Sequence, residues 1–215
     1  MFQQEWALSG RSCPLRTIAI VDESPQSQFL YPEFELFRQL FVQHGLRAVV
    51  CDPSELHLAD GALRYQGEAI DIVYNRLTDF YLEDPRHSAL RLAYLAGQVL
   101  LTPHPQAHAL YADKRNLMVL SDANALQAMG LPAHDAMTLA LVVPQTVALG
   151  PDNAEALWRE RRDWFFKPAT GYGSRAAYRG DKITKGVWQS LLAAGDTMAQ
   201  RIVRPGARTL GEGQE

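Results

Sequence analysis

Residues 164–175 read W-F-F-K-P-A-T-G-Y-G-S-R, and this segment is the most informative part of the chain. Its short aromatic run is typical of a buried strand, and the Gly-Tyr-Gly-Ser turn is typical of a loop between two strands. Lys167, at the end of that strand, can place a positive charge beside a phosphate chain. Because the sequence contains no G-x-x-x-x-G-K-[ST] motif, the segment predicts a nucleotide triphosphate site of a kind other than the Walker type.

The composition is that of a globular chain with a hydrophobic core and little net charge. Its 215 residues can hold one large domain or two small ones, and 47% of them are hydrophobic. The formal net charge of −3 lacks the basic excess that nucleic-acid binding usually requires. Cys13 and Cys51 are not in a metal-binding spacing, and we expect no disulfide between them. With no apolar run as long as a membrane span, we expect a soluble cytoplasmic protein without membrane or nucleic-acid partners.

The first half of the sequence predicts a compact α/β domain over residues 16–103, after a lead-in of residues 1–15. A segment with helical spacing lies between two apolar runs, and this strand–helix–strand order implies parallel strands covered by helices. The elements that we expect are strands over 17–21 and 47–51, a helix over 31–44, a strand pair over 62–65 and 69–74, a helix over 88–97 and a strand over 99–103.

The second half predicts a helical connection over residues 104–135, a small α+β lobe over 136–205 and a polar tail over 206–215. The glycine-rich turn lies inside this lobe, and we interpret it as the tip of a hairpin. The elements that we expect in the lobe are a strand over 139–143, a helix over 153–162, strands over 164–167 and 175–178, a helix over 187–192 and a strand over 198–203.

Three elements in this order resemble the ATP-grasp superfamily of carboxylate–amine ligases: Asp113-Lys114, Phe166-Lys167-Pro168 with its glycine turn, and the strand M-A-Q-R-I-V at 198–203. The segments D-G-A-L-R-Y-Q-G-E-A-I-D-I-V-Y-N-R-L (60–77) and A-D-K-R-N-L-M-V-L-S-D (112–122) are similar to one branch of it, glutathionylspermidine synthase and the circularly permuted ATP-grasp proteins. The resemblance implies a pre-ATP-grasp, Rossmann-like βαβ domain followed by a small nucleotide-binding lobe.

The resemblance also implies how ATP is held. Two lysines would contact the α- and β-phosphates, and a glycine loop would close over them with its backbone N–H groups. A hinge strand would hydrogen-bond the adenine edge through its backbone, with Ile202 or Phe166 packed on the ring. The residues assigned to ATP are Lys114, Lys167, Thr170, Gly171, Tyr172, Gly173, Ser174, Gln200, Arg201, Ile202 and Val203.

The family reaction converts a small-molecule carboxylate and ATP into an acyl phosphate, which an amine then attacks to form an amide. Asn75 and Arg76 end a strand in the first domain, where related ligases hold the substrate, although an ion pair of Arg76 with Asp71 or Asp79 is an alternative. Simpler interpretations also remain for the ATP-binding residues. Lys167 can protect a sheet edge, Lys114 can be an ordinary surface lysine, and the glycines can serve a plain β-turn.

The sequence departs from the family pattern at its C-terminal end. In ATP-grasp enzymes the lobe after the hinge carries the Mg²⁺ ligands, and here only about a dozen residues follow it. We therefore expect an incomplete ATP-grasp fold, with no metal ligands within this chain, that is inactive as a ligase by itself. An exposed apolar face on the small lobe would favour a homodimer or a complementary chain.

The sequence leaves one alternative function open and argues against a dinucleotide site and a histidine metal site. The alternative is a non-catalytic nucleotide-binding or interaction module on the same fold. A dinucleotide-binding Rossmann enzyme is disfavoured, because V-D-E-S-P at 21–25 replaces the glycine motif. His104 and His108 have the spacing of helical metal ligands, but Pro105 lies between them and no third ligand is near in the sequence.

Overall fold

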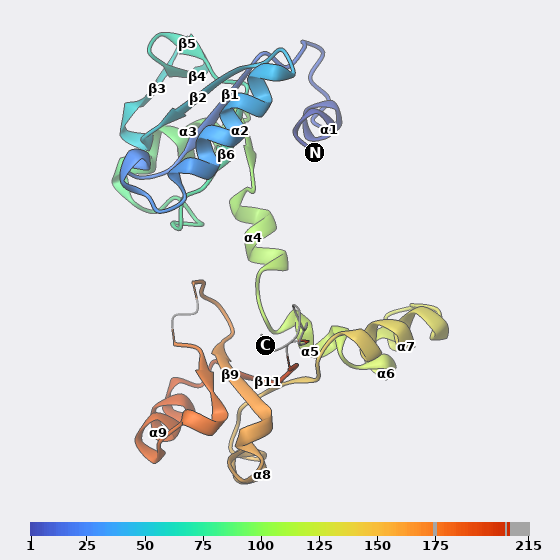
Figure 1. The fold of residues 1–215 in the computed structure, drawn as a ribbon. Helices are drawn as coiled ribbons and strands as arrows, with labels where there is room; N and C mark the ends of the chain where they lie inside the picture. Colours follow the sequence, from blue (N-terminus) through green and yellow to red (C-terminus); the bar gives the residue numbers. More distant parts are fainter. Residues whose placement is uncertain (174–175, 205, 207–215) are drawn as a thin grey trace, which may run out of the picture. The chain divides into compact units, whose positions relative to one another are not determined.

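The computed structural model describes residues 1–173, 176–204 and 206. The chain divides into two compact units, residues 1–110 and 111–215 (Figure 1). Within the described residues, no helix combines the length and the apolarity needed to cross a bilayer. The mixed α/β class predicted from the sequence is confirmed, since one unit is built on a parallel sheet and the other on an antiparallel sheet.

Unit 1 is centred on a four-stranded parallel sheet in the order β2-β1-β6-β7. All five residues of β1 (Thr17–Val21) are buried, as expected for a central strand with helices on both faces. Helix α2 (Tyr31–Gln43) joins β1 to β2, which makes the predicted strand–helix–strand unit. The remaining strands of the sheet are β2 (Arg47–Cys51), β6 (Ile72–Asn75) and β7 (Leu100–Thr102).

The alternation of β1 side chains divides the core of unit 1 into two clusters. Ile18 and Ile20 pack with Phe34 of α2 on one face, whereas Ala19 and Val21 belong to the cluster on the other face. The second cluster also contains residues of α3 (Ser88–Leu95). The sequence analysis assigned no element to the lead-in, but its helix α1 (Phe2–Leu8) contributes two aromatic residues to the first cluster.

A small antiparallel sheet completes unit 1, in the order β3-β4-β5. Its strands are β3 (Leu56–Ala59), β4 (Ala62–Tyr65) and β5 (Glu68–Ala69). The single strand expected over residues 69–74 is therefore wrong, because β5 ends before β6 begins in a different sheet. The short helices are η1 (Pro25–Ser27), η2 (Pro53–Glu55) and η3 (Pro85–His87), and α4 (Pro105–Tyr111) follows β7.

Unit 2 is centred on an antiparallel sheet in the order β10-β9-β11-β8. Its strands are β8 (Thr146–Ala148), β9 (Trp164–Pro168), β10 (Tyr178–Arg179) and β11 (Thr197–Arg201). One core cluster joins Phe166 of β9 to Leu157 of α8 (Ala154–Arg159) and Trp188 of α9 (Lys185–Ala194). The other helices of the unit are α5 (Asn116–Leu120), α6 (Ala123–Ala128), α7 (Ala133–Val142), η4 (Arg161–Asp163) and η5 (Gly180–Lys182).

The strand predicted over residues 139–143 is wrong, since these residues belong to helix α7 and to its C-terminal end. A continuous apolar run such as L-A-L-V-V fits a buried strand and a helix equally well. Pro132, at the N-terminal boundary, favours the helix. Val143 is extended, as a residue before proline usually is, and the strand itself, β8, begins only at Thr146. The five-part division of the chain drawn from the sequence stays a prediction.

Candidate functional site

A groove of about 730 Å³ lies on one face of the antiparallel sheet of unit 2. Most of its lining comes from three separate segments: the turn before α5, the strand β9 with the glycine loop that follows it, and β11 with the residues after it. Each of these segments was singled out in the sequence as part of one nucleotide site. The fold therefore brings together residues that lie up to about 90 positions apart, from Lys114 to Arg204.

The alternation of β9 side chains decides which of its residues reach the groove. Phe165 and Lys167 line the groove, whereas Trp164 and Phe166 are buried in the core on the opposite face. The expectation that Phe166 packs on an adenine ring is therefore wrong, because its side chain is 0% exposed within the core. Phe165, the neighbour of Phe166, lines the groove instead.

The two lysines named from the sequence lie in the same groove. Lys167 Nζ donates a hydrogen bond to Gln200 Oε1 at 2.8 Å, and Lys114 Nζ donates to the carbonyl oxygen of Gly171 at 3.1 Å. Burial and the nearby Lys114 charge lower the pKa of Lys167. The backbone N–H of Lys114 also donates to the carbonyl of Ala169 at 2.9 Å, which ties the segment before α5 to the end of β9.

The groove is positively charged. Besides the two lysines, Arg179 and Arg204 line it, and no carboxylate is found among the described residues that do so. An adjoining hollow of about 640 Å³ shares both arginines and also includes Arg162 and Asp163. A concave surface that is lined by several cations, with few anions to compensate their charge, favours a ligand with more than one negative charge.

The glycine loop after β9 has the backbone that the turn chemistry requires. Gly171 has φ +118°, a conformation that side-chain-bearing residues rarely adopt, and Gly173 has φ +62°. Both glycines line the groove together with Tyr172. Thr170 is exposed and is not among the groove residues, and Ser174 lies outside the described part of the chain.

The hinge segment presents fewer free backbone groups than expected. The N–H of Arg201 donates to the carbonyl of Gln145, and the N–H of Ile202 donates to the carbonyl of Asp163, both at 2.9 Å. Among the described residues, no hydrogen bond engages the N–H of Val203, which lines the groove. This leaves Val203, rather than Arg201 or Ile202, as the N–H donor of the hinge that is available to a ligand.

The side chain of Arg201 is held away from ligand binding by its own partners. Its guanidinium donates to Glu160 at 3.1 Å, lies 3.6 Å from Asp163 and stacks over the Trp164 ring at 4.3 Å. Arg201 therefore lines the groove without an available charge. Arg179, which the sequence analysis missed, forms an ion pair with Asp181 at 3.2 Å. It pairs with Phe165 across β9 and β10 and lies on the groove face.

Arg179 was missed because it lies beyond the return strand, which was expected over residues 175–178. The described pairing is Tyr178 with Phe166 and Arg179 with Phe165, which places Arg179 opposite a groove residue. The other missed groove residues are Pro144, Phe165, Ala177 and Arg204; a period-2 reading of W-F-F-K with Lys167 as the anchor would have found Phe165.

Unit 1 holds the other two residues named from the sequence, and both side chains have structural partners. Asn75 is buried, donates to the carbonyl of Pro103 and accepts from the N–H of Leu77. Arg76 donates to the Tyr74 hydroxyl at 2.9 Å and pairs with Glu33 at 3.2 Å. The suggested ion pair of Arg76 with Asp71 or Asp79 is thus wrong.

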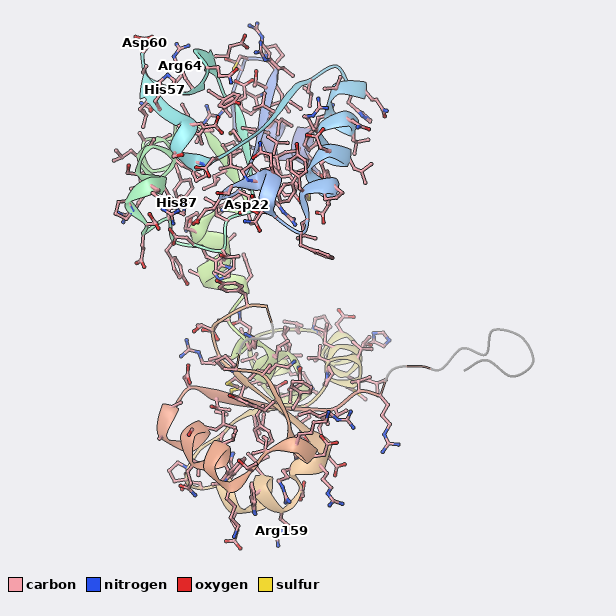
Figure 2. All side chains as sticks on the ribbon, turned by 60° about the vertical axis from the view of Figure 1, so that its left-hand side comes forward. Asp22, His57, Asp60, Arg64, His87 and Arg159 are labelled. Atoms are coloured by element: carbon pink, nitrogen blue, oxygen red, sulfur yellow. The ribbon has the colours of Figure 1, made fainter. Side chains whose placement is uncertain are left out.

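The carboxylates near these strand ends have other roles. Asp71 accepts from the N–H groups of Arg16 and Thr17, and Asp79 contacts the buried His87 at 2.7 Å. Asp22 follows β1, and burial raises its pKa. Figure 2 labels Asp22 and His87 in unit 1.

The histidine pair has aromatic neighbours. The ring of His104 stacks on Tyr94 and accepts from the N–H of Ala107, and the ring of His108 stacks on Phe80 at 3.8 Å. Across the residues that the structure describes, no group of three or more His, Cys, Asp or Glu side chains is placed to hold a metal ion.

Solved structures of several proteins share this arrangement of elements, although no protein-family model and no curated protein matches the chain. A glutathione synthetase-like effector from Globodera pallida aligns with 95% of the chain at 14% identity and a TM-score of 0.56. The D-cycloserine synthetase DcsG aligns with 86% at 20% identity and 0.49. The ATP-grasp ligase PsnB, solved with a phosphomimetic variant of its minimal precursor, Mg and ADP, aligns with 90% at 19% identity and 0.49.

These likenesses concern the fold. The chain spans 44% of the effector, 58% of DcsG and 68% of PsnB. The ATP-grasp fold expected from the sequence is confirmed at the level of the fold alone. The narrower resemblance to the glutathionylspermidine synthase branch stays a prediction.

Proposed function

We propose that the groove of unit 2 binds ATP, with Lys114 and Lys167 at the phosphates and residues 202–203 at the adenine. The observation that carries this proposal is the convergence of two lysines, 53 positions apart, on one groove whose described lining contains no carboxylate. A site that binds a polyphosphate has to supply positive charges and backbone N–H donors, more than an apolar surface of matching shape. The two lysines supply the first, and the loop at Gly171 and Gly173 supplies the second.

The geometry also supports the position of the base. Phe165 and Ile202 line the groove beyond Lys167, on the side away from the glycine loop. An aromatic ring and an aliphatic side chain can pack on the two faces of a purine. The N–H of Val203 can donate to a ring nitrogen at its edge. The glycine loop and the hinge would then hold the two ends of one nucleotide.

The reaction class that fits this fold is ATP-dependent carboxylate–amine ligation. In that reaction a carboxylate oxygen attacks the γ-phosphorus, ADP leaves, and an amine displaces phosphate from the acyl phosphate to give an amide. The groove residues would neutralise the phosphate charges and align the γ-phosphorus. A substrate role of Asn75 and Arg76 stays a prediction, as do a homodimer and a complementary chain.

Magnesium does not fit the residues that line the groove. Mg²⁺ takes carboxylate, phosphate and water oxygens as ligands, and the described lining offers lysines, arginines, Gln200, Tyr172 and apolar side chains but no carboxylate. We therefore assign no Mg²⁺ ligand to this chain and derive no step through the metal. The same observation favours a second candidate function, in which this chain binds a nucleotide without transferring a phosphoryl group.

The proposal is tested by the affinity for ATP of a Lys167→Ala variant, measured by isothermal titration calorimetry with and without Mg²⁺. Loss of a half-buried cation beside a phosphate should weaken binding about tenfold or more. Lys185→Ala is the matched control, because Lys185 is exposed on α9 outside the groove, and it should bind as the unaltered protein does.

Equal affinity of the Lys167→Ala variant and the unaltered protein would remove this lysine from the site and overturn the proposal. Phosphate release on addition of carboxylates and amines separates the ligase from the binding module. ATP binding without any such release supports the second candidate function, and release above the rate without substrates supports the first.

A further inference from the structure

The groove contains one neutral side chain whose role a backbone hinge does not explain. Gln200 lies on β11, opposite both Phe165 of β9 and Thr146 of β8. Its amide oxygen accepts a hydrogen bond from Lys167 Nζ at 2.8 Å, and its amide nitrogen donates to Thr146 Oγ1 at 3.1 Å. A residue needed only for its backbone would not require both ends of its side chain to be engaged.

The direction of this hydrogen-bond chain is fixed by chemistry. An ammonium group has donors and no acceptor, so Lys167 must face the amide oxygen of Gln200. The amide nitrogen then has to donate, and the Thr146 hydroxyl, having accepted, donates in turn to the carbonyl of Pro144 at 2.9 Å. The chain thus runs from the groove to a backbone carbonyl.

The far end of this chain is rigid. Thr146 is 3% exposed, and its N–H donates to Ser121 Oγ at 3.1 Å. Ser121 is the C-terminal cap of α5, the helix that begins two residues after Lys114. Thr146 therefore links the Gln200 side chain to the end of α5, and a buried partner of this kind restricts the rotamers of a side chain bonded to it.

We propose that Gln200 is a positioning residue that holds the Lys167 ammonium group in the groove, as an intact positive charge, through its hydrogen bonds to Lys167 and Thr146. The inference rests on the proposed nucleotide function and goes beyond it by giving the Gln200 side chain a task separate from the hinge.

A neutral amide suits this task better than a carboxylate. Glutamate at position 200 would also hold the Lys167 ammonium group. Its carboxylate would, however, compensate the positive charge of Lys167 and repel the phosphate oxygens of a nucleotide. Alanine would leave the charge intact without holding it. The other ionisable groups that line the groove are cationic or Tyr172, within the described residues, so position 200 decides whether Lys167 has an anionic neighbour there.

The test compares Gln200→Glu, Gln200→Ala and Thr146→Val with Lys167→Ala in the full chain. ATP affinity is measured by calorimetry, and the pKa of Lys167 is measured without ligand by NMR titration of ¹⁵N-lysine-labelled protein. The sequence contains only four lysines, at positions 114, 167, 182 and 185, so the Lys167 signal can be assigned with the variants. Thr197→Val is the matched control, since Thr197 is equally buried on the same sheet and donates to the carbonyl of Leu191 instead.

We expect Gln200→Glu to raise the Lys167 pKa and to weaken ATP binding about tenfold. Gln200→Ala should lower the Lys167 pKa further, because a hydrogen bond to the charged form is lost, and weaken binding about threefold. Thr146→Val should weaken binding about twofold or more, and Thr197→Val should change neither quantity. Native circular dichroism and unfolding midpoints confirm that each variant is folded.

Two results would overturn the inference. One is unchanged ATP affinity and unchanged Lys167 pKa in both Gln200 variants, with weakened binding in Lys167→Ala, a pattern that leaves the proposed function standing. The other is an equal effect of Thr146→Val and Thr197→Val, which would assign the loss to sheet stability. If Lys167→Ala also binds ATP normally, the proposed function itself fails.

Discussion

Cations near the strand ends of unit 1 and the two groove lysines of unit 2 are partnered in opposite ways. In unit 1, cations near the carboxyl ends of the parallel strands face carboxylates: Arg76 pairs with Glu33 at 3.2 Å and Arg86 with Asp84 at 2.7 Å. In unit 2, Lys114 and Lys167 face only neutral oxygens among the hydrogen bonds described for them. Charges compensated within the fold hold structure together, whereas uncompensated charges in a groove are available to a ligand.

The sequence has the same asymmetry at the level of whole units. Residues 1–110 contain eight basic and 13 acidic side chains, and residues 111–215 contain 13 basic and 11 acidic ones. Every lysine of the chain belongs to the second group. A polyanion is therefore attracted to unit 2, and the acidic unit 1 is a poor place for it.

The largest effect we expect separates the two faces of the unit 2 sheet. Phe166→Ala removes a fully buried ring from the core and should lower the free energy of unfolding by about 3–5 kcal/mol. Phe165→Ala, its neighbour on the groove face, should cost about 1 kcal/mol or less and weaken ATP binding instead. Urea unfolding measures the free energy of unfolding of both variants, and ATP titration measures their affinity. Equal losses of stability would contradict the assignment of the two faces.

An intermediate effect should come from Asp79, which contacts the buried His87 in unit 1. Burial raises the pKa of Asp79, but hydrogen bonds from the N–H groups of Asp84 and Glu83 and from His87 outweigh it, so the net pKa is lowered. Asp79→Asn should cost about 1–3 kcal/mol at neutral pH without changing ATP affinity. Asp60→Asn is the control, since the Asp60 side chain is 84% exposed.

The sign of the pH dependence follows from the lowered pKa of Asp79. The ionised carboxylate stabilises the folded state above its unfolded pKa, and this stabilisation is lost as pH falls through the lower folded pKa. The difference in unfolding free energy between the unaltered protein and Asp79→Asn should therefore shrink on acidification below about pH 4. A difference that grows toward low pH would show that Asp79 is not the stabilising group.

The smallest effect on stability should come from Lys114→Ala. Its ammonium donates to an exposed loop carbonyl rather than to a carboxylate, so the free energy of unfolding should change by less than about 0.5 kcal/mol. ATP affinity should nevertheless fall about three- to tenfold, because a phosphate contact is lost. Lys182→Ala, at an exposed position on η5, should change neither. A stability loss in Lys114→Ala above that of Asp79→Asn would reverse the comparison between the units.

Much of the fold could be predicted, because its signals are local. The run T-I-A-I-V, the helical spacing after Pro32 and the next apolar run specify β1, α2 and β2 with little ambiguity. The lysine pair was identified through the order of three short segments. Their spacing in the sequence suggests that these segments converge on one groove. The convergence itself is produced by tertiary structure, through the pairing of β9 with β11.

The missed features of the fold and of the groove depend on strand pairing and on long-range contacts, which the sequence leaves open. In W-F-F-K both central residues are aromatic, so the faces of Phe165 and Phe166 follow only from strand pairing. The run of α7 is apolar without alternation, which hides its helical period. The commitment of the Arg201 side chain to Glu160 was equally hidden, because these residues lie 41 positions apart.

The contact between Lys114 and the glycine loop has a consequence for the entropy of binding. A long lysine side chain that is free in solution loses on the order of 2 kcal/mol of rotamer freedom when a ligand fixes it. In this structure the Lys114 tip is restrained by the Gly171 carbonyl, and its backbone by Ala169. Under the proposed function much of that ordering would precede nucleotide binding, so the loop would serve as a scaffold for the cation as well as a cover for the phosphates.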